Sequence, residues 1–221
     1  MLMTCPNYSE FDFISIVKRM LDVEDLTKLH ELKHYELLTR EQDQSTIWHE
    51  KFYSNLDMFL PLYENFVAQI IANTNSAGYG CSLPKFLYQS VPGFRVQLTN
   101  NLAVGDWHKD SDYNHQKEEV NRIFALTEMF GNNSIWIESE EDKGDYHPVR
   151  ICAGSFKKLN TICLKHGNKI NDTGQTRVSF DFRILQLDQF IDNKRKSING
   201  CEMSIGKYWK EAKVVESYWD L

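Results

Sequence analysis

The segment from Arg177 to Arg183 alternates strictly between polar and apolar side chains and reads Arg-Val-Ser-Phe-Asp-Phe-Arg. Successive side chains of a β-strand point to opposite faces, so this pattern predicts a strand with one polar and one apolar face. Polar groups cannot lie in a dry core without partners. The polar side chains therefore predict the wall of a polar interior, with the apolar face packed on the other side.

Further short strands are predicted between residues 94 and 187, where turn residues separate them. No helical pattern lies between these strands, which argues against a parallel α/β sheet. The predicted strands cover residues 94–99, 120–127, 134–139, 147–152, 159–164 and 176–187. This arrangement favours an α+β class that is mostly β: a double-stranded β-helix (jelly roll, cupin-like) with N-terminal helices packed on the outside.

Two helical regions are predicted ahead of the strands. Asp22 would cap a helix over residues 23–38, in which leucines recur at helical spacing. Thr46 or Ser45 would begin a second region that extends to Ile70. Within it, Pro61 predicts a kink or the meeting of two helices, because proline removes a donor and clashes with the preceding turn.

A single domain accounts for the whole chain, residues 1–221. We expect a helical part over residues 1–75, a jelly-roll core over 76–190 and a C-terminal extension over 191–221. Four aromatic residues of the extension predict that it docks on the core, namely Tyr208, Trp209, Tyr218 and Trp219.

Composition narrows the partners. The formal net charge of -6 gives no basic footprint for nucleic-acid phosphates. The start of the chain lacks a signal-peptide pattern, and no apolar run approaches the roughly 20 residues that span a bilayer. Five cysteines, without a Cys-x-x-Cys pair, suit a reduced compartment. We therefore expect a cytoplasmic protein with no nucleic-acid and no membrane partner.

His108 and Asp110 form a His-x-Asp pair at the end of a predicted strand, where both side chains can point toward one metal ion. His166, in Leu-Lys-His-Gly-Asn, can add a second imidazole. Two imidazoles and one carboxylate form the ligand set that holds non-haem Fe(II) on one face and leaves the opposite positions open. A His-x-Asp pair alone is weak evidence, whereas the ordered series that continues to His166 and Arg177 is much stronger.

Arg177 is the strongest candidate for binding an organic anion. Its planar guanidinium can pair with a carboxylate through two hydrogen bonds, and Ser179 can donate to the same group. Arg183 shares their face and is the alternative anchor, although a salt bridge with Asp181 or a surface acid suits it better.

The motifs resemble the iron(II)/2-oxoglutarate-dependent oxygenase superfamily and, within it, the group similar to the streptomycin biosynthesis protein StrG. The resemblance covers about residues 46–190. It rests on Phe-Arg-Val-Gln, Trp-His-Lys-Asp-Ser-Asp-Tyr-Asn-His-Gln, Ile-Trp-Ile-Glu-Ser-Glu, His-Gly-Asn and Thr-Gly-Gln-Thr-Arg-Val-Ser-Phe-Asp-Phe-Arg. The first forty and last thirty residues contribute little to it.

The resemblance implies site residues as well as a superfamily. His108, Asp110 and His166 correspond to the iron ligands, and Arg177 with Ser179 to the site for the distal carboxylate of 2-oxoglutarate. Fe(II) is then the cofactor, with 2-oxoglutarate and O2 as cosubstrates. Related halogenases lack the carboxylate ligand, so Asp110 favours hydroxylation, desaturation, epimerisation or ring formation over halogenation.

The expected activity is a dioxygenase (hydroxylase) reaction on a small polar metabolite, such as an amino acid, a cyclitol or a sugar derivative. The reaction would convert 2-oxoglutarate to succinate and carbon dioxide. Two alternatives are a non-catalytic metal-binding jelly-roll protein and a hydroxylase that acts on a protein side chain.

Other side chains are candidate substrate contacts or partners of the metal ligands, by strand alternation or by the resemblance. They are Arg95, Gln97, His115, Asn121, Trp136, Glu138, Asn168 and Arg183. For His115 the ordinary interpretation is a loop histidine, and for Glu138 a solvated strand carboxylate.

Overall fold

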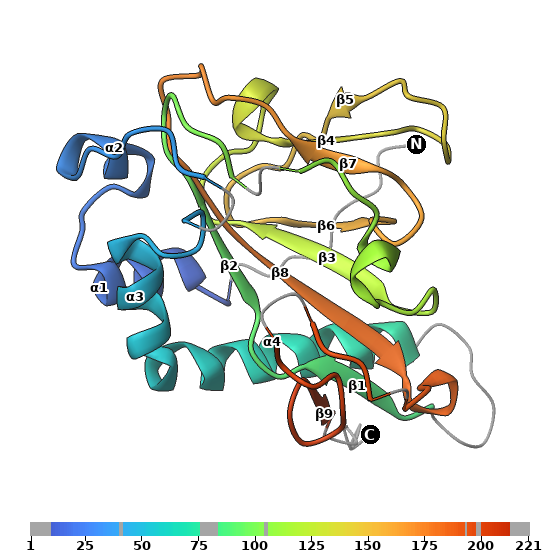
Figure 1. Cartoon of the computed structure of the whole chain (residues 1–221). Helices are drawn as coiled ribbons and strands as arrows, with labels where there is room; N and C mark the ends of the chain where they lie inside the picture. Colours follow the sequence, from blue (N-terminus) through green and yellow to red (C-terminus); the bar gives the residue numbers. More distant parts are fainter. Residues whose placement is uncertain are drawn as a thin grey trace.

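The computed structural model describes residues 10–39, 42–75, 84–103, 106–192, 194–197 and 200–212. Within them, two antiparallel β-sheets lie one over the other, and helices cover the outer side of the larger sheet (Figure 1). The predicted fold class, mostly β with helices on the outside, is confirmed.

The larger sheet has the strand order β6-β3-β8-β1-β9, and β2 also pairs with β8. Its strands are β1 (Phe86–Gln89), β2 (Gly93–Gln97), β3 (Val120–Ala125), β6 (Phe156–Leu159), β8 (Arg177–Gln186) and β9 (Trp209–Glu211). The smaller sheet has the order β5-β4-β7. It contains β4 (Ile135–Ile137), β5 (His147–Pro148) and β7 (His166–Asn168).

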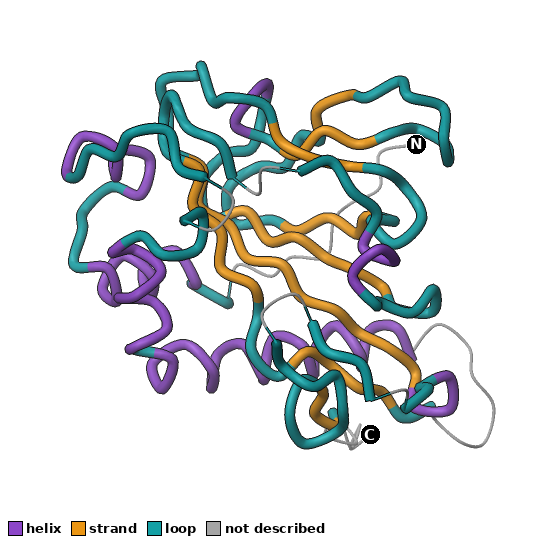
Figure 2. Tube along the Cα trace, viewed as in Figure 1, coloured by secondary structure: helices purple, strands orange, loops and turns teal. Residues whose placement is uncertain are grey.

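Strand β8 is the centre of the larger sheet (Figure 2). It pairs with β3 on one edge, and with β1 and β2 in turn on the other. Its apolar side chains, among them Phe180 and Phe182, belong to the main hydrophobic core. Its polar side chains, among them Arg177 and Ser179, line a cavity between the two sheets. The alternation predicted from the sequence is therefore confirmed, and both faces of the strand are buried.

The main core lies between the larger sheet and the helices. The helices are α1 (Phe13–Leu21), η1 (Leu26–Lys28), α2 (Leu29–Leu32), α3 (Ile47–Ser54) and α4 (Leu56–Asn75). Phe13 of α1 meets Phe59, Phe66 and Phe180 with ring centroids 5.1 to 5.2 Å apart. Buried aromatic contacts of this kind contribute both apolar area and edge-to-face attraction. They anchor the helices and leave the opposite face of the sheet for the cavity.

A second, smaller core joins the two sheets. Ile123 and Leu159 of the larger sheet pack with Ile137 of the smaller sheet and with Val149. This apolar layer fixes the separation of the sheets beside the polar cavity, so the site is built between two packed walls.

The predicted helix over residues 23–38 is wrong. Asp22 ends α1 with a left-handed backbone (φ 58°) instead of beginning a helix, and only the short η1 and α2 follow. Leu26 and Leu29 are buried, but Leu32 is 61% and Leu37 is 56% exposed, so the buried stripe does not continue along the predicted helix. Helices of this length depend on tertiary packing of an apolar stripe, and without it the pattern does not produce a helix.

Of the two outcomes predicted for Pro61, the meeting of two helices at that residue is wrong, and the kink stays a prediction. Helix α4 runs through Pro61, and the two helices of this region meet at Asn55. The backbone bond that Pro61 cannot make would reach the carbonyl of Asp57, and both residues lie on the exposed side of the helix. Water can satisfy that carbonyl, while Phe59 and Tyr63 hold the buried side.

The strand predicted over residues 159–164 is wrong beyond its first residue, because β6 ends at Leu159 and a turn follows. In that turn the carbonyls of Thr161 and Ile162 accept hydrogen bonds from Asp110 and Ser111. The strand predicted over 147–152 is limited to β5. Strands β1 and β7 were not predicted, since both are short and β7 consists of His-Gly-Asn.

The C-terminal segment packs on the outer end of the larger sheet. Strand β9 pairs with β1, and Tyr208 and Trp209 share a small core with Leu87 and Leu185. The other two aromatic residues of the predicted extension, Tyr218 and Trp219, lie outside the described residues.

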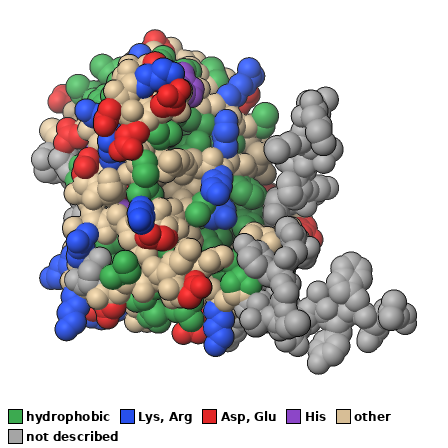
Figure 3. Space-filling model, turned by 90° about the vertical axis from the view of Figure 1, so that its right-hand side faces the viewer, with side chains coloured by type: hydrophobic (Ala, Val, Ile, Leu, Met, Phe, Trp, Pro, Cys, Tyr) green, Lys and Arg blue, Asp and Glu red, His purple; other side chains and the backbone are tan. Residues whose placement is uncertain are grey.

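The surface gives two further observations. On the face shown in Figure 3, the described basic and acidic side chains are interspersed. Within the part of the chain that the structure describes, no helix is both long and apolar enough to cross a membrane.

Candidate metal centre

His108 and His166 face each other across a two-stranded bridge. The amide of each donates to the carbonyl of the other, at N···O distances of 3.0 and 2.9 Å. Asp110, in contrast, begins the 3-10 helix η2 (Asp110–Tyr113), and its amide donates to the carbonyl of Thr161. The expectation that His108 and Asp110 share one strand face is therefore wrong. The two side chains converge because the chain turns between them, not because it alternates.

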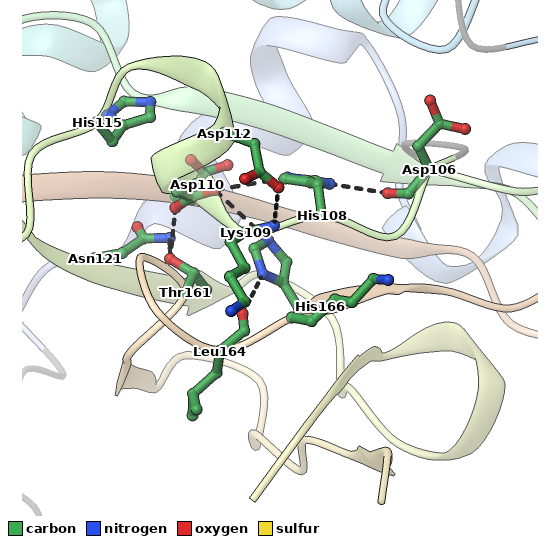
Figure 4. Close-up of polar contacts among 12 residues, drawn as sticks. Asp106, His108, Lys109, Asp110, Asp112, His115, Asn121, Thr161, Leu164 and His166 are labelled. Atoms are coloured by element: carbon green, nitrogen blue, oxygen red, sulfur yellow. Dashed lines mark hydrogen bonds and ion pairs between the residues drawn. The ribbon is translucent and has the colours of Figure 1, made fainter. Parts of the chain in front are cut away.

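The three predicted ligands nevertheless meet at one point (Figure 4). Nε2 of His108 and Nε2 of His166 each lie 3.6 Å from Oδ1 of Asp110. One ligand atom from each residue can be chosen so that all lie within 4.8 Å of one another. That spacing suits atoms arranged around a common ion.

Hydrogen bonds fix the ring orientation of both histidines. Nδ1 of His108 lies 2.8 Å from the carbonyl of Asp106, and Nδ1 of His166 lies 3.1 Å from the carbonyl of Leu164. A carbonyl oxygen only accepts, so each Nδ1 carries the proton and each Nε2 keeps its lone pair. Burial lowers the pKa of His166 despite the opposing charge of Asp110, which favours the neutral imidazole that a metal requires.

The two carboxylate oxygens of Asp110 differ: one accepts hydrogen bonds from other side chains, and the other faces the histidines. Its Oδ2 accepts from the Thr161 hydroxyl at 2.5 Å and from Nη2 of Arg183 at 2.7 Å. Its Oδ1 is the atom that both imidazoles approach. Burial disfavours the charged carboxylate, but the Arg183 guanidinium outweighs burial and holds the pKa of Asp110 well below its usual range.

The donor set therefore fits a divalent metal. Two neutral imidazole nitrogens and one ionised carboxylate oxygen converge, and their other polar atoms are already hydrogen-bonded. Such outer partners are what orient ligands in metal sites. Imidazole with carboxylate suits a first-row transition metal, and three protein ligands leave other positions open.

A small cavity of about 70 Å³ lies beside the three ligands, and Arg177 and Ser179 line it. The Arg177 side chain is buried, and neither its Nε nor its Nη1 has a hydrogen-bond partner. Burial lowers the pKa of Arg177 to about 10, so the group stays protonated at neutral pH. The nearby carboxylates of Asp43 and Asp181 only partly offset the cost of burying this cation, and two of its nitrogens donate no hydrogen bond, so the cavity is electrostatically suited to an anion.

Arg183 lines the same cavity but is surrounded by acids. Its Nη1 lies 3.3 Å from Oδ2 of Asp181, its Nη2 binds Asp110, and its Nε lies 3.6 Å from Oε2 of Glu119. The predicted salt bridge with Asp181 is therefore present. Arg183 thus lacks a hydrogen bond only at Nε, which faces Glu119, whereas Arg177 lacks hydrogen bonds at both Nε and Nη1.

Three more of the predicted residues line the cavity. Nε of Arg95 donates to Asp181 at 2.8 Å, and Nδ2 of Asn121 donates to the Thr161 hydroxyl at 2.9 Å. Oδ1 of Asn121 is buried without a partner. The third is Asn168, which donates to the carbonyl of Ser134, directly before β4.

Gln97, Trp136 and Glu138 lie outside the lining of this cavity. Gln97 donates to the carbonyl of Lys169 at 2.7 Å, and Lys169 places its ammonium 3.4 Å from the centre of the Trp136 ring. Glu138 is buried rather than solvated and accepts from the amide of Lys165. These side chains hold loops near the site.

His115 lies in a larger cavity of about 320 Å³ that also touches His108 and Asp110. Its Nδ1 is 2.6 Å from Oε2 of Glu119, which is buried. We call this larger cavity the outer chamber. His115 lines it and is fixed by Glu119, so it is not a free loop histidine.

Thr161 and Gly167 are site residues that sequence reasoning missed. Thr161 lies in a turn and gives no pattern signal. Gly167 follows His166, and a Cβ there would lie 2.7 Å from the ring of Trp107. A tryptophan directly before one ligand and a glycine directly after another were the only available signal for that packing.

No family model matches the chain. The chain is 37% identical, over 202 residues, to "Streptomycin biosynthesis protein StrG" of Streptomyces griseus, and the match covers 91% of this chain and 93% of that protein. The chain belongs to the StrG family. Because the match covers nearly the full length of both proteins, the family assignment applies to the whole of the described fold.

Solved structures match the StrG-family chain only distantly. The ThoJ-Ni complex, a non-heme monooxygenase, is 16% identical with a TM-score of 0.39, over 64% of this chain and 54% of that one. AviO1 from Streptomyces viridochromogenes is 12% identical with a TM-score of 0.38, over 79% and 84% of the two chains. Likenesses of this size assign no activity to the StrG-family chain.

Proposed function

We propose that this StrG-family chain is an Fe(II)- and 2-oxoglutarate-dependent oxygenase that hydroxylates a small polar metabolite. The observation that carries the proposal is the Arg177 guanidinium, whose Nε and Nη1 have no hydrogen-bond partner, in the cavity beside His108, Asp110 and His166. A metal-ligand set alone would suit many metalloproteins. A buried cation with open donors next to that set selects for an organic anion bound beside the metal.

The residues assign distinct tasks. His108, Asp110 and His166 would hold iron, which would supply the chemistry that places one oxygen atom of O2 in the substrate and the other in succinate. Arg177 would bind the distal carboxylate of 2-oxoglutarate through Nε and Nη1, and Ser179 lines the same wall. These contacts would orient the cosubstrate, which is the protein's main contribution to cofactor chemistry.

The two cavities suggest where each reactant lies. The inner cavity is small, at about 70 Å³, and contains the arginine, so it suits the cosubstrate. The outer chamber is larger, at about 320 Å³, and its walls carry tyrosine, serine and glutamine side chains. Its lining comes from distant parts of the chain, among them Tyr53, Gln89 and Tyr208. Hydrogen-bonding side chains in a cavity of this size suit a metabolite such as an amino acid, cyclitol or sugar derivative.

The first test uses the iron-loaded protein without oxygen. Addition of 2-oxoglutarate should give a weak visible charge-transfer band, and Asp110→Ala should lose it. A screen of amino acids, cyclitols and sugars should then find compounds that raise succinate production above the uncoupled background. Bound metal with neither the band nor any 2-oxoglutarate turnover would mean a non-catalytic metal-binding protein.

A further inference from the structure

We propose that Arg183 is a positioning residue that restricts Asp110 to binding the metal through one oxygen. The inference rests on the metal site of the proposed function but not on 2-oxoglutarate. Arg183 lies on β8 in the same polar row as Arg177, where a carboxylate anchor was the alternative role. Its contacts give it a different role.

The geometry around Asp110 separates its two oxygens. Oδ2 accepts two hydrogen bonds, from Nη2 of Arg183 at 2.7 Å and from the Thr161 hydroxyl at 2.5 Å. Oδ1 is the atom nearest to both imidazoles, at 3.6 Å from each Nε2. For the carboxylate to bind a metal through both oxygens, Oδ2 would have to leave a charged partner and a hydroxyl donor at once.

The Thr161 hydroxyl is itself directed. Its oxygen accepts from Nδ2 of Asn121 at 2.9 Å, which leaves its proton free to point at Asp110. Asn121 comes from β3 and Thr161 from the turn after β6, so two neighbouring strands fix this donor. The hydrogen bond to Oδ2 is therefore part of a chain and not a chance contact.

Arg183 is held from several sides. Asp181 binds its Nη1 at 3.3 Å, and Glu119 lies 3.6 Å from its Nε. Oε1 of Gln89 and the hydroxyl of Tyr208 each lie 3.4 Å from Nη1. With its side chain buried among these groups, the guanidinium cannot swing toward a cosubstrate without leaving carboxylates unpaired.

The consequence concerns how many metal positions stay open. Two imidazoles and one carboxylate oxygen occupy three positions of a six-coordinate ion, and a second carboxylate oxygen would occupy a fourth. A chelating 2-oxo acid and O2 together need three. Arg183 and Thr161 would thus keep the site open by withholding Oδ2 from the metal.

The test measures Co(II) binding by the purified protein, with the visible d–d bands as readout. Arg183→Leu should weaken Co(II) affinity about 10- to 100-fold, the usual effect of removing an outer partner of a ligand. Arg183→Lys should recover part of this loss, and Thr161→Val should weaken affinity about tenfold. At saturating Co(II), the bands of Arg183→Leu should differ from those of the parent, because a second carboxylate oxygen changes the coordination number.

Tyr208→Phe is the matched control, because it removes a neighbour of Arg183 that does not touch Asp110; its Co(II) affinity should stay within about twofold. Circular dichroism of each variant reports folding. If Arg183→Leu does not fold, Arg183→Lys and Thr161→Val decide. The proposal is overturned if both bind Co(II) like the parent with unchanged bands, or if a folded Arg183 variant loses 2-oxoglutarate affinity while Co(II) binding is unchanged.

The same data separate this proposal from the proposed function. Weakened Co(II) binding in Arg183→Leu, in a protein that never turns over 2-oxoglutarate, would support the role of Arg183 and reject the oxygenase. Normal 2-oxoglutarate turnover with unchanged metal binding in the variants would support the oxygenase and reject the role of Arg183.

Discussion

Arg177 and Arg183 are both buried guanidiniums on one face of the same strand, yet their surroundings are opposite. Arg177 has two nitrogens without any hydrogen-bond partner, and burial lowers its pKa to about 10. Arg183 faces carboxylates of Asp110, Asp181 and Glu119, which raise its pKa despite its burial. The difference teaches that an arginine's existing partners bear on its role: we expect Arg183 to stabilise the apoprotein, and we propose that Arg177 binds a ligand.

The largest expected difference is in stability. Arg183→Leu leaves buried carboxylates without their shared cation, and we expect it to lower the free energy of unfolding by about 3–5 kcal/mol. Urea denaturation of the metal-free protein measures this. A loss below about 1 kcal/mol would show that the carboxylates find other partners and that Arg183 is not central to the apoprotein.

Binding of 2-oxoglutarate should depend more on Arg177 than on Arg183. Arg177→Leu removes the open donors and should weaken 2-oxoglutarate binding about 100-fold, or roughly 3 kcal/mol, in the metal-loaded protein. Calorimetric titration with 2-oxoglutarate under nitrogen measures this effect, and Co(II) affinity serves as the control that should not change. Equal loss of 2-oxoglutarate affinity in both Leu variants would remove the distinction between the two arginines.

A smaller effect concerns the cost of leaving Arg177 unpaired. Without 2-oxoglutarate, Arg177→Leu should raise the free energy of unfolding by about 1 kcal/mol, because the cost of burying the Arg177 cation exceeds its attraction to Asp43 and Asp181. With 2-oxoglutarate at about 100 times its Kd, the parent protein should gain about 2.7 kcal/mol and the variant almost nothing. Paired thermal and urea unfolding experiments would reveal the crossover, and a variant that is less stable than the parent without ligand would contradict it.

The comparison also shows how far sequence could lead. The alternation from Arg177 to Arg183 is a local pattern with a period of two, so it predicted the strand and its polar face correctly. It favoured Arg177 as the anchor and predicted the salt bridge between Arg183 and Asp181, but it could not show that Asp110 and Glu119, far away in the chain, also face Arg183. A face follows from local sequence, whereas the partners along that face depend on the whole fold.

The same limit applies to the metal ligands and to the wall residues. His108 and Asp110 were predicted to share one strand face, but the chain is not a strand there. Asp110 begins a 3-10 helix, and its amide donates to the carbonyl of Thr161. Gln97 shares a strand with Arg95, but its amide binds loop carbonyls and only Arg95 lines the inner cavity. Alternation assigns a side of the sheet but does not show where along that side the cavity ends.

The smallest expected effect on 2-oxoglutarate affinity concerns Ser179, which lies two residues from Arg177 on the cavity wall. If it donates to the same carboxylate, Ser179→Ala should weaken 2-oxoglutarate binding about five- to tenfold, or roughly 1 kcal/mol, because one hydrogen bond is lost and the guanidinium remains. In Arg177→Leu the further loss from Ser179→Ala should shrink, since both side chains would bind one group. A double-mutant cycle on 2-oxoglutarate affinity measures this coupling. Additive losses would place the carboxylate on Arg177 alone and leave Ser179 as a small wall residue that makes room for it.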